Sequence, residues 1–130
     1  MATILVVDDS MFQRHAVAKV LKENGYEVIE ADNGQSGLDR IEQDKPDAVI
    51  LDLIMPRCNG FETLEVLKRR GNRIPIFVFT ADIQATSRRR CLDLGATAFL
   101  NKPLNKEELQ GVLDRHLPKG DRNGGHSLPD

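Results

Sequence analysis

The sequence predicts an α/β fold built on a doubly wound, five-stranded parallel sheet with five helices. Five short apolar runs of strand length alternate with five segments whose apolar residues recur at helical spacing. The third run, residues 48–54, lacks polar alternation, which is typical of a strand buried on both faces of a parallel sheet. We expect right-handed crossovers and the strand order 2-1-3-4-5.

The elements follow one another along the chain with clear boundaries. The predicted strands are residues 4–7, 26–31, 48–52, 74–79 and 96–100. The predicted helices are residues 10–24, 34–45, 60–70, 83–94 and 105–117, and the apolar stripe of the first begins at Phe12. The second strand is more polar than the others, so we expect it near a sheet edge. Residues 1–118 form one predicted domain, and residues 119–130, rich in glycine and proline, form a predicted disordered tail.

Composition excludes several classes of protein. The 130 residues carry a net charge of −2, which gives no electrostatic case for binding nucleic acid. No apolar run approaches the ~20 residues of a membrane span, and the N-terminus lacks the features of a signal peptide. Cys58 and Cys91 show neither disulfide-framework nor zinc-site spacing. We therefore expect a cytoplasmic protein with free thiols and no membrane association.

Polar residues gather where the predicted strands end. Asp8 and Asp9 follow the first strand, Asp52 interrupts the third, Thr80 follows the fourth and Lys102 follows the fifth. The carboxyl ends of parallel strands share one edge of the sheet, and ligands bind there where the strand order reverses. With strands one and three adjacent, three carboxylates converge, and a hard divalent cation such as Mg²⁺ relieves their repulsion.

These residue types suit phosphoryl transfer. A carboxylate such as Asp52 can attack a phosphoryl group to form an aspartyl phosphate. A metal ion and the Lys102 ammonium would neutralise charge on the phosphoryl oxygens, and Thr80 could donate a hydrogen bond to them.

The chain resembles the response-regulator receiver domains of two-component signalling, of the single-domain CheY type with a flavodoxin-like fold. The resemblance covers residues 3–117 and rests on the residues at the strand ends, together with Met55-Pro56, Gly60, Ala81 and Pro103. It implies a switch that a sensor histidine kinase phosphorylates on Asp52. The switch would act by binding a downstream protein and would not be an enzyme beyond its own phosphorylation and dephosphorylation.

The resemblance also assigns roles to single residues. It implies that Asp9, Asp52 and the backbone carbonyl of Ile54 hold Mg²⁺, with Asp8 acting largely through water. Thr80 and Lys102 would contact the phosphoryl group, with Thr80 and Phe99 as the switch pair.

Three further features follow from the same resemblance. The Lys102-Pro103 peptide is expected to be cis. Ile54 and Asp82 would flank the path of the hydrolytic water and tune the lifetime of the phosphorylated state. Phe99 departs from the tyrosine found there in many members, which puts any step that needs that hydroxyl in doubt.

The expected partner surface comprises the fourth helix, the fifth strand and the fifth helix. The basic run Arg88-Arg89-Arg90 lies on the fourth helix and reads either as a solvated face or as part of that surface. His15, His116 and His126 lie at no strand end, so we interpret them as surface residues. We expect a monomer or a weak dimer.

Other functions stay open at this point. The chain could be a phosphorelay intermediate or the receiver part of a larger regulator. A phosphatase with an aspartate nucleophile is less favoured, because haloacid-dehalogenase-type enzymes have a second aspartate where this sequence has Ile54. A flavin-binding protein is disfavoured because no phosphate-binding loop follows the first strand.

Overall fold

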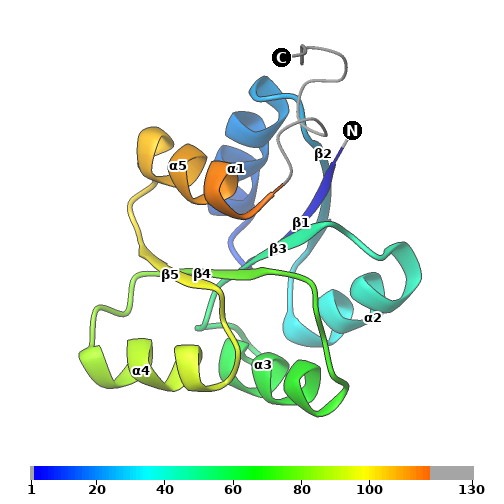
Figure 1. The fold of residues 1–130 in the computed structure, drawn as a ribbon, viewed down its shortest axis with the longest axis vertical. Helices are drawn as coiled ribbons and strands as arrows, with labels where there is room; N and C mark the ends of the chain where they lie inside the picture. The colour runs from blue at the N-terminus through cyan, green and yellow to red at the C-terminus, as the bar shows by residue number, and fades with distance from the viewer. Residues whose placement is uncertain (1, 118–130) are drawn as a thin grey trace.

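A five-stranded parallel sheet in the order β2-β1-β3-β4-β5 forms the centre of the chain, with helices on both faces (Figure 1). The computed structural model describes residues 2–117. The strands are β1 (Thr3–Val7), β2 (Glu27–Ala31), β3 (Ala48–Leu51), β4 (Ile76–Thr80) and β5 (Ala98–Asn101). The helices are α1 (Met11–Glu23), α2 (Gly34–Asp44), α3 (Gly60–Arg69), α4 (Ala85–Asp93) and α5 (Lys106–His116). The predicted fold class and strand order are confirmed.

Two apolar layers cover the two faces of the sheet. Helices α1 and α5 lie on one face and α2, α3 and α4 on the other (Figure 1). Successive side chains of a strand point to opposite faces, so Ile4 and Val6 join the layer under α1 and α5 while Leu5 and Val7 join the other. This two-sided burial is why the strands read as continuous apolar runs.

The register of the sheet aligns the ends of β1 and β3. Val7 pairs with Leu51, so the residues that follow, Asp8 and Asp52, leave neighbouring strands at the same level. The amide of Asp52 donates to the carbonyl of Val7 at 3.0 Å, and the amide of Asp8 donates to the carbonyl of Ala31 at 3.1 Å. The two aspartates are therefore held by the hydrogen-bonding pattern of the sheet.

The first and fourth helices differ in detail from the sequence-based prediction. Phe12, which was expected in the apolar stripe of the first helix, is 78% exposed. The fourth helix begins at Ala85 and not at Ile83, which is also exposed. The structural reason is Asp82, whose carboxylate accepts the amide of Gln84 and fixes a turn ahead of the helix. The predicted tail, residues 119–130, lies outside the described residues, and within residues 2–117 no helix is long and apolar enough to cross a membrane.

Candidate functional site

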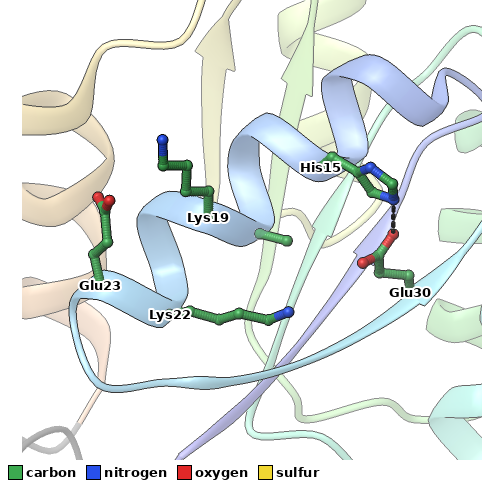
Figure 2. A pocket seen from close by; sticks show the side chains of 6 residues that line it. His15, Lys19, Lys22, Glu23 and Glu30 are labelled. Carbon is green, nitrogen blue, oxygen red and sulfur yellow. Dashed lines mark ion pairs between the residues drawn. The ribbon is translucent and has the colours of Figure 1, made fainter.

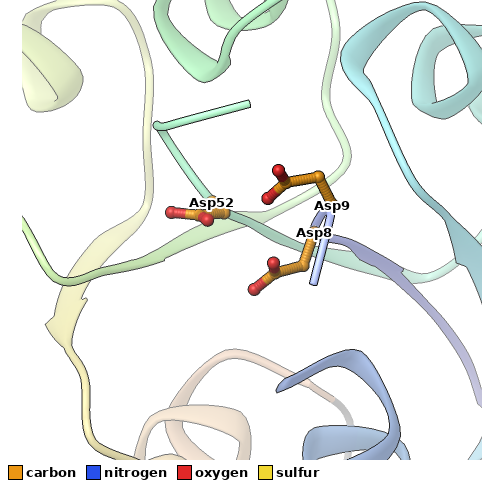
Figure 3. A group of neighbouring side chains, drawn as sticks. All are labelled: Asp8, Asp9 and Asp52. Carbon is orange, nitrogen blue, oxygen red and sulfur yellow. The ribbon is translucent and has the colours of Figure 1, made fainter. Parts of the chain in front are cut away.

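Three carboxylates converge at the carboxyl edge of the sheet (Figure 3). Oxygens of Asp8, Asp9 and Asp52 all lie within 4.8 Å of one another. Asp8 and Asp52 are buried, whereas Asp9 is exposed to solvent. The convergence that the strand-end pattern predicted is present, with one carboxylate open to an incoming ligand.

Lys102 lies against two of these carboxylates. Its Nζ atom is 2.9 Å from Oδ2 of Asp8 and 3.3 Å from Oδ2 of Asp52. The peptide from Lys102 to Pro103 is cis, as the resemblance implied. Three carboxylates and one ammonium leave the cluster with excess negative charge, and its donor atoms are oxygens. That combination fits a hard divalent cation such as Mg²⁺.

The pKa values of Asp52 and Lys102 are both raised. Burial raises the pKa of Asp52, and the charge of Asp8 adds to this effect, while the ammonium of Lys102 opposes it. Burial lowers the pKa of Lys102, but its hydrogen bond to Asp8 and the charges of Asp52 and Asp8 outweigh that effect. A basic carboxylate beside a firmly protonated ammonium is suited to nucleophilic attack on an anionic phosphoryl group.

The two aspartates of the acidic pair have different environments. Asp8 already accepts two hydrogen bonds, from the Ser10 amide at 2.9 Å and from Lys102. Asp9 is instead exposed to solvent. This difference fits the expectation that Asp9 binds a metal directly and Asp8 acts through water.

Arg14 supports the acidic pair, a role that the sequence analysis missed. From α1 its Nη1 atom donates to the carbonyl of Asp8 at 2.8 Å, and its Nε atom donates to Glu30 of β2 at 2.8 Å. The guanidinium therefore ties the loop after β1 to the neighbouring strand. The signal in the sequence is weak, because an arginine about one turn into a helix is ordinary.

The loop after β3 is fixed by the start of α3. Asn59 and Glu62 form a capping box, each side chain accepting the other residue's amide. The amide of Gly60 donates to the carbonyl of Leu53 at 2.9 Å. A Cβ atom on Gly60 would lie 2.5 Å from the carbonyl oxygen of Asp52, so only glycine allows this approach.

The remaining predicted site residues lie around this cluster. Thr80 is fully buried, and its Oγ1 atom accepts the amide of Asp82 at 3.3 Å. Phe99 is half-buried and packs against the apolar layer under α2, α3 and α4. Ile54 is 65% exposed beside Asp52, and its amide donates to Asp52 at 3.4 Å. The carboxylate of Asp82 is directed to the start of α4, where it accepts from Gln84 and Ser87.

Other reactive side chains lie away from the cluster. Burial raises the pKa of the Cys91 thiol to about 11, which leaves it unreactive at neutral pH. His15 and His116 are exposed, and His126 lies outside the described residues.

A surface groove beside α1 does not resemble a ligand site (Figure 2). Cationic and anionic side chains are mixed along it, and His15 faces Glu30 at 3.9 Å. The groove is lined by His15, Ala18, Lys19, Lys22, Glu23 and Glu30. Because positive and negative side chains are mixed, the groove has no net charge that would favour a charged ligand.

Comparison with known proteins identifies the class. Residues 4–114 match the response regulator receiver domain family, and the chain belongs to that family. Members of this family are generally signalling switches and not enzymes, they pair with sensor histidine kinases, and they typically bind Mg²⁺ at an acidic pocket.

Individual relatives agree with this assignment. The chain is 44% identical over 119 residues to the response regulator MprA of Mycolicibacterium vanbaalenii, covering 88% of this chain and 52% of that protein. It is 43% identical over 120 residues to MprA of Mycobacterium tuberculosis, covering 89% and 52%. The chain thus spans about half the length of the curated relatives it matches.

Solved structures match the whole fold. The chemotaxis protein CheY4 of Vibrio cholerae superposes with a TM-score of 0.83 at 34% identity, covering 90% of this chain and 99% of that one. The signal receiver domain of a putative LuxO repressor from Vibrio parahaemolyticus gives a TM-score of 0.84 at 25% identity, covering 88% of each chain.

Proposed function

We propose that this receiver domain accepts a phosphoryl group from a sensor histidine kinase onto Asp52, in a Mg²⁺-dependent reaction, and then binds a downstream protein. The observation that carries the proposal is the convergence of Asp8, Asp9 and Asp52 with Lys102 at one edge of the sheet. No other carboxylate cluster of this kind is found among residues 2–117.

The chain's own groups account for the transfer step. A carboxylate oxygen of Asp52 attacks the phosphorus atom, an O–P bond forms, and the P–N bond to the donor histidine breaks as its imidazole nitrogen takes up a proton from solvent. The Lys102 ammonium neutralises charge on the phosphoryl oxygens. Asp9, Asp52 and the carbonyl of Ile54 would hold Mg²⁺, with Asp8 acting through water. The bound ion would supply further neutralisation and orientation.

Exposed apolar side chains around the acceptor support docking of a protein donor. Large hydrophobic residues that are more than half exposed occur close in sequence to the strand ends that carry Asp9, Asp52 and Thr80, at the start of α1 and in the loops after β3 and β4: Met11, Phe12, Ile54 and Ile83. A protein that delivers a phosphoryl group to Asp52 must cover this rim. Burial of these side chains would contribute to its affinity.

Thr80 and Phe99 form the proposed switch. When Thr80 moves toward the phosphoryl group, it vacates space that the half-buried ring of Phe99 can fill. Burying a ring contributes on the order of 1.5–3 kcal/mol, enough to bias a two-state equilibrium. The downstream protein would then bind the surface of α4, β5 and α5, where Arg88 and Arg89 are exposed.

The proposal also covers catalysis, oligomeric state and location. We expect no catalysis beyond the domain's own phosphorylation and dephosphorylation, and no binding to nucleic acid or membrane. A monomer or weak dimer in the cytoplasm is expected, a location that the two free cysteines support. The half-length match to MprA favours, as a second candidate, the receiver part of a larger regulator. A phosphorelay intermediate shares the same chemistry.

The test is phosphorylation by a small donor. The protein is incubated with acetyl phosphate, with and without Mg²⁺, and its intact mass is measured. We expect one added phosphoryl group that requires Mg²⁺ and is lost in Asp52→Asn. An Asp52→Asn variant that gains the group as the parent does would falsify the assignment of the acceptor.

A further inference from the structure

Asp82 has every polar group engaged in the loop between β4 and α4. Its amide donates to Oγ1 of Thr80 at 3.3 Å, and its carbonyl accepts from Nδ2 of Asn101 at 2.9 Å. Its carboxylate accepts from the amide of Gln84 at 2.9 Å and from the hydroxyl of Ser87 at 2.6 Å. One residue therefore joins the end of β4, the end of β5 and the start of α4.

Helix α4 depends on such polar contacts more than the other helices do. It buries two residues, Ser87 and Cys91, whereas α1 buries four. Its N-cap residue, Gln84, makes no side-chain capping bond, so the carboxylate of Asp82 serves the start of the helix instead. Loss of the bond to Ser87 would consequently loosen the attachment of this end.

The same contacts hold Thr80 in place. Its hydroxyl is bonded to the amide of Asp82, and its carbonyl accepts from the amide of Lys102 at 2.9 Å and from the side chain of Asn101 at 3.3 Å. Asn101 thus reaches the carbonyls of both Thr80 and Asp82. A turn of the Thr80 hydroxyl must break its bond to the Asp82 amide, and a displacement of the Thr80 main chain must also stretch the bond from Asn101.

We propose that Asp82, Ser87 and Asn101 form a clasp that holds Thr80 and the start of α4 in the resting arrangement. The clasp sets the fraction of molecules in which Thr80 is free to turn toward a phosphoryl group. This inference rests on the proposed function, because it concerns regulation of the same site. It makes Asp82 a positioning residue that acts through Thr80 and α4.

The clasp has a measurable consequence for binding. A ligand that requires the activated arrangement binds with an apparent affinity reduced by the population that is not competent. Removing one hydrogen bond made only in the resting arrangement raises the population of the activated, binding-competent arrangement. A typical intramolecular hydrogen bond then corresponds to about a 3- to 10-fold increase in apparent affinity.

The experiment uses beryllium fluoride as the phosphoryl mimic. It is titrated into the full chain at saturating Mg²⁺, and binding is followed by amide NMR. Ser87→Ala and Asn101→Ala should each bind the mimic about 3- to 10-fold more tightly than the parent. Thr86→Ala, which removes an exposed hydroxyl from the neighbouring position of α4, is the matched control and should bind as the parent does. Ser87→Thr restores the hydroxyl and should return the affinity toward the parent value.

A second readout separates this role from a merely structural one. Without the mimic, the amide signals of Thr80 and Asp82 in Ser87→Ala should move along the line that joins the free and mimic-bound positions of the parent. The affinity for Mg²⁺ alone should stay unchanged, because Ser87 lies in α4 and not in the acidic cluster.

The outcomes of this experiment test the clasp and the proposed function separately. A parent that fails to bind the mimic in Mg²⁺ overturns the proposed function and the clasp with it. If the parent binds the mimic and both Ser87→Ala and Asn101→Ala bind it with the affinity of the parent, the clasp alone is overturned. Weaker binding by both variants would also overturn it, because the contacts would then support the activated arrangement.

Discussion

The Nζ atom of Lys102 lies 3.3 Å from the Asp52 carboxylate, across 50 positions of sequence. The same ammonium is 2.9 Å from Asp8, so it is shared between two buried carboxylates. Shared in this way, it does not fully offset the burial of Asp52, whose pKa remains raised. In the metal-free protein, the ionised carboxylate of Asp52 therefore destabilises the folded state.

Asp52→Asn should raise the thermal stability of the metal-free protein at neutral pH. Because the folded-state pKa of Asp52 lies above its ordinary value of 3.8, the folded state binds the extra proton more readily than the unfolded chain. The contribution of Asp52 to stability is thus fully present below pH 3.8 and is lost as the pH rises through the folded-state value. Thermal melts of the parent and of Asp52→Asn between about pH 3.8 and pH 7 test the sign of the stability difference. A variant less stable than the parent at pH 7 would contradict it.

Asp9→Ala should weaken Mg²⁺ binding by about 10-fold or more, and by more than Asp8→Ala does. Asp9 is the exposed member of the cluster, whereas both oxygens of Asp8 already accept hydrogen bonds. Calorimetric titration of Mg²⁺ into the parent and the two variants gives the ranking. Equal losses, or a larger loss for Asp8→Ala, would mean that the roles are shared or exchanged.

Ile54→Asn should speed loss of the phosphoryl group by roughly 5- to 30-fold, equivalent to about 1–2 kcal/mol of barrier. The branched side chain of Ile54 stands exposed beside the acceptor and has no group that could hold a water molecule. The rate is followed by intact mass after the donor is removed. Ile83→Asn, at the exposed isoleucine of the neighbouring loop, is the control and should decay as the parent does. If Ile54→Asn decays no faster than the parent, Ile54 does not limit hydrolysis.

Gly60→Ala should destabilise the fold by about 1–3 kcal/mol. The added methyl group would lie 2.5 Å from the carbonyl oxygen of Asp52 and 2.6 Å from Cα of Leu53, both backbone atoms that cannot rotate away. Gly111→Ala is the matched control. Its nearest neighbour is the mobile end of Arg115 at 3.7 Å, so this helix position should gain about 0.5–1 kcal/mol. Urea unfolding of the two variants would contradict the account if both changed stability in the same direction.

Much of the site could be predicted because parallel strands bring their ends together. Once the five strands are placed in order, Asp8, Asp52 and Lys102 must lie at one edge of the sheet, although the first and the last are 94 positions apart in the sequence. The cis peptide before Pro103 came from the family resemblance and is present in the structure. At these positions the residue pattern at the strand ends and the strand order predict the same placement.

The supporting contacts could not be predicted in the same way. The link from Arg14 to the carbonyl of Asp8 depends on the rotation of α1 about its axis, which apolar spacing fixes only coarsely. That spacing also placed Phe12 in the buried stripe, whereas the helix turns this ring to solvent. The bond between Asp82 and Ser87 arises because a turn precedes α4, and the apolar Ile83 concealed that turn by extending the helical pattern.

Chemical trapping of the phosphorylated protein tests most directly whether Asp52 is the phosphoacceptor. Borohydride reduces an acyl phosphate to an alcohol, so it converts a phosphorylated aspartate to homoserine and leaves free carboxylates unchanged. After treatment with acetyl phosphate and Mg²⁺, peptide mass spectrometry should find homoserine at position 52 and aspartate at positions 8 and 9. Homoserine at position 8 or 9, with Asp52 unmodified, would contradict the assignment on which the proposed mechanism depends.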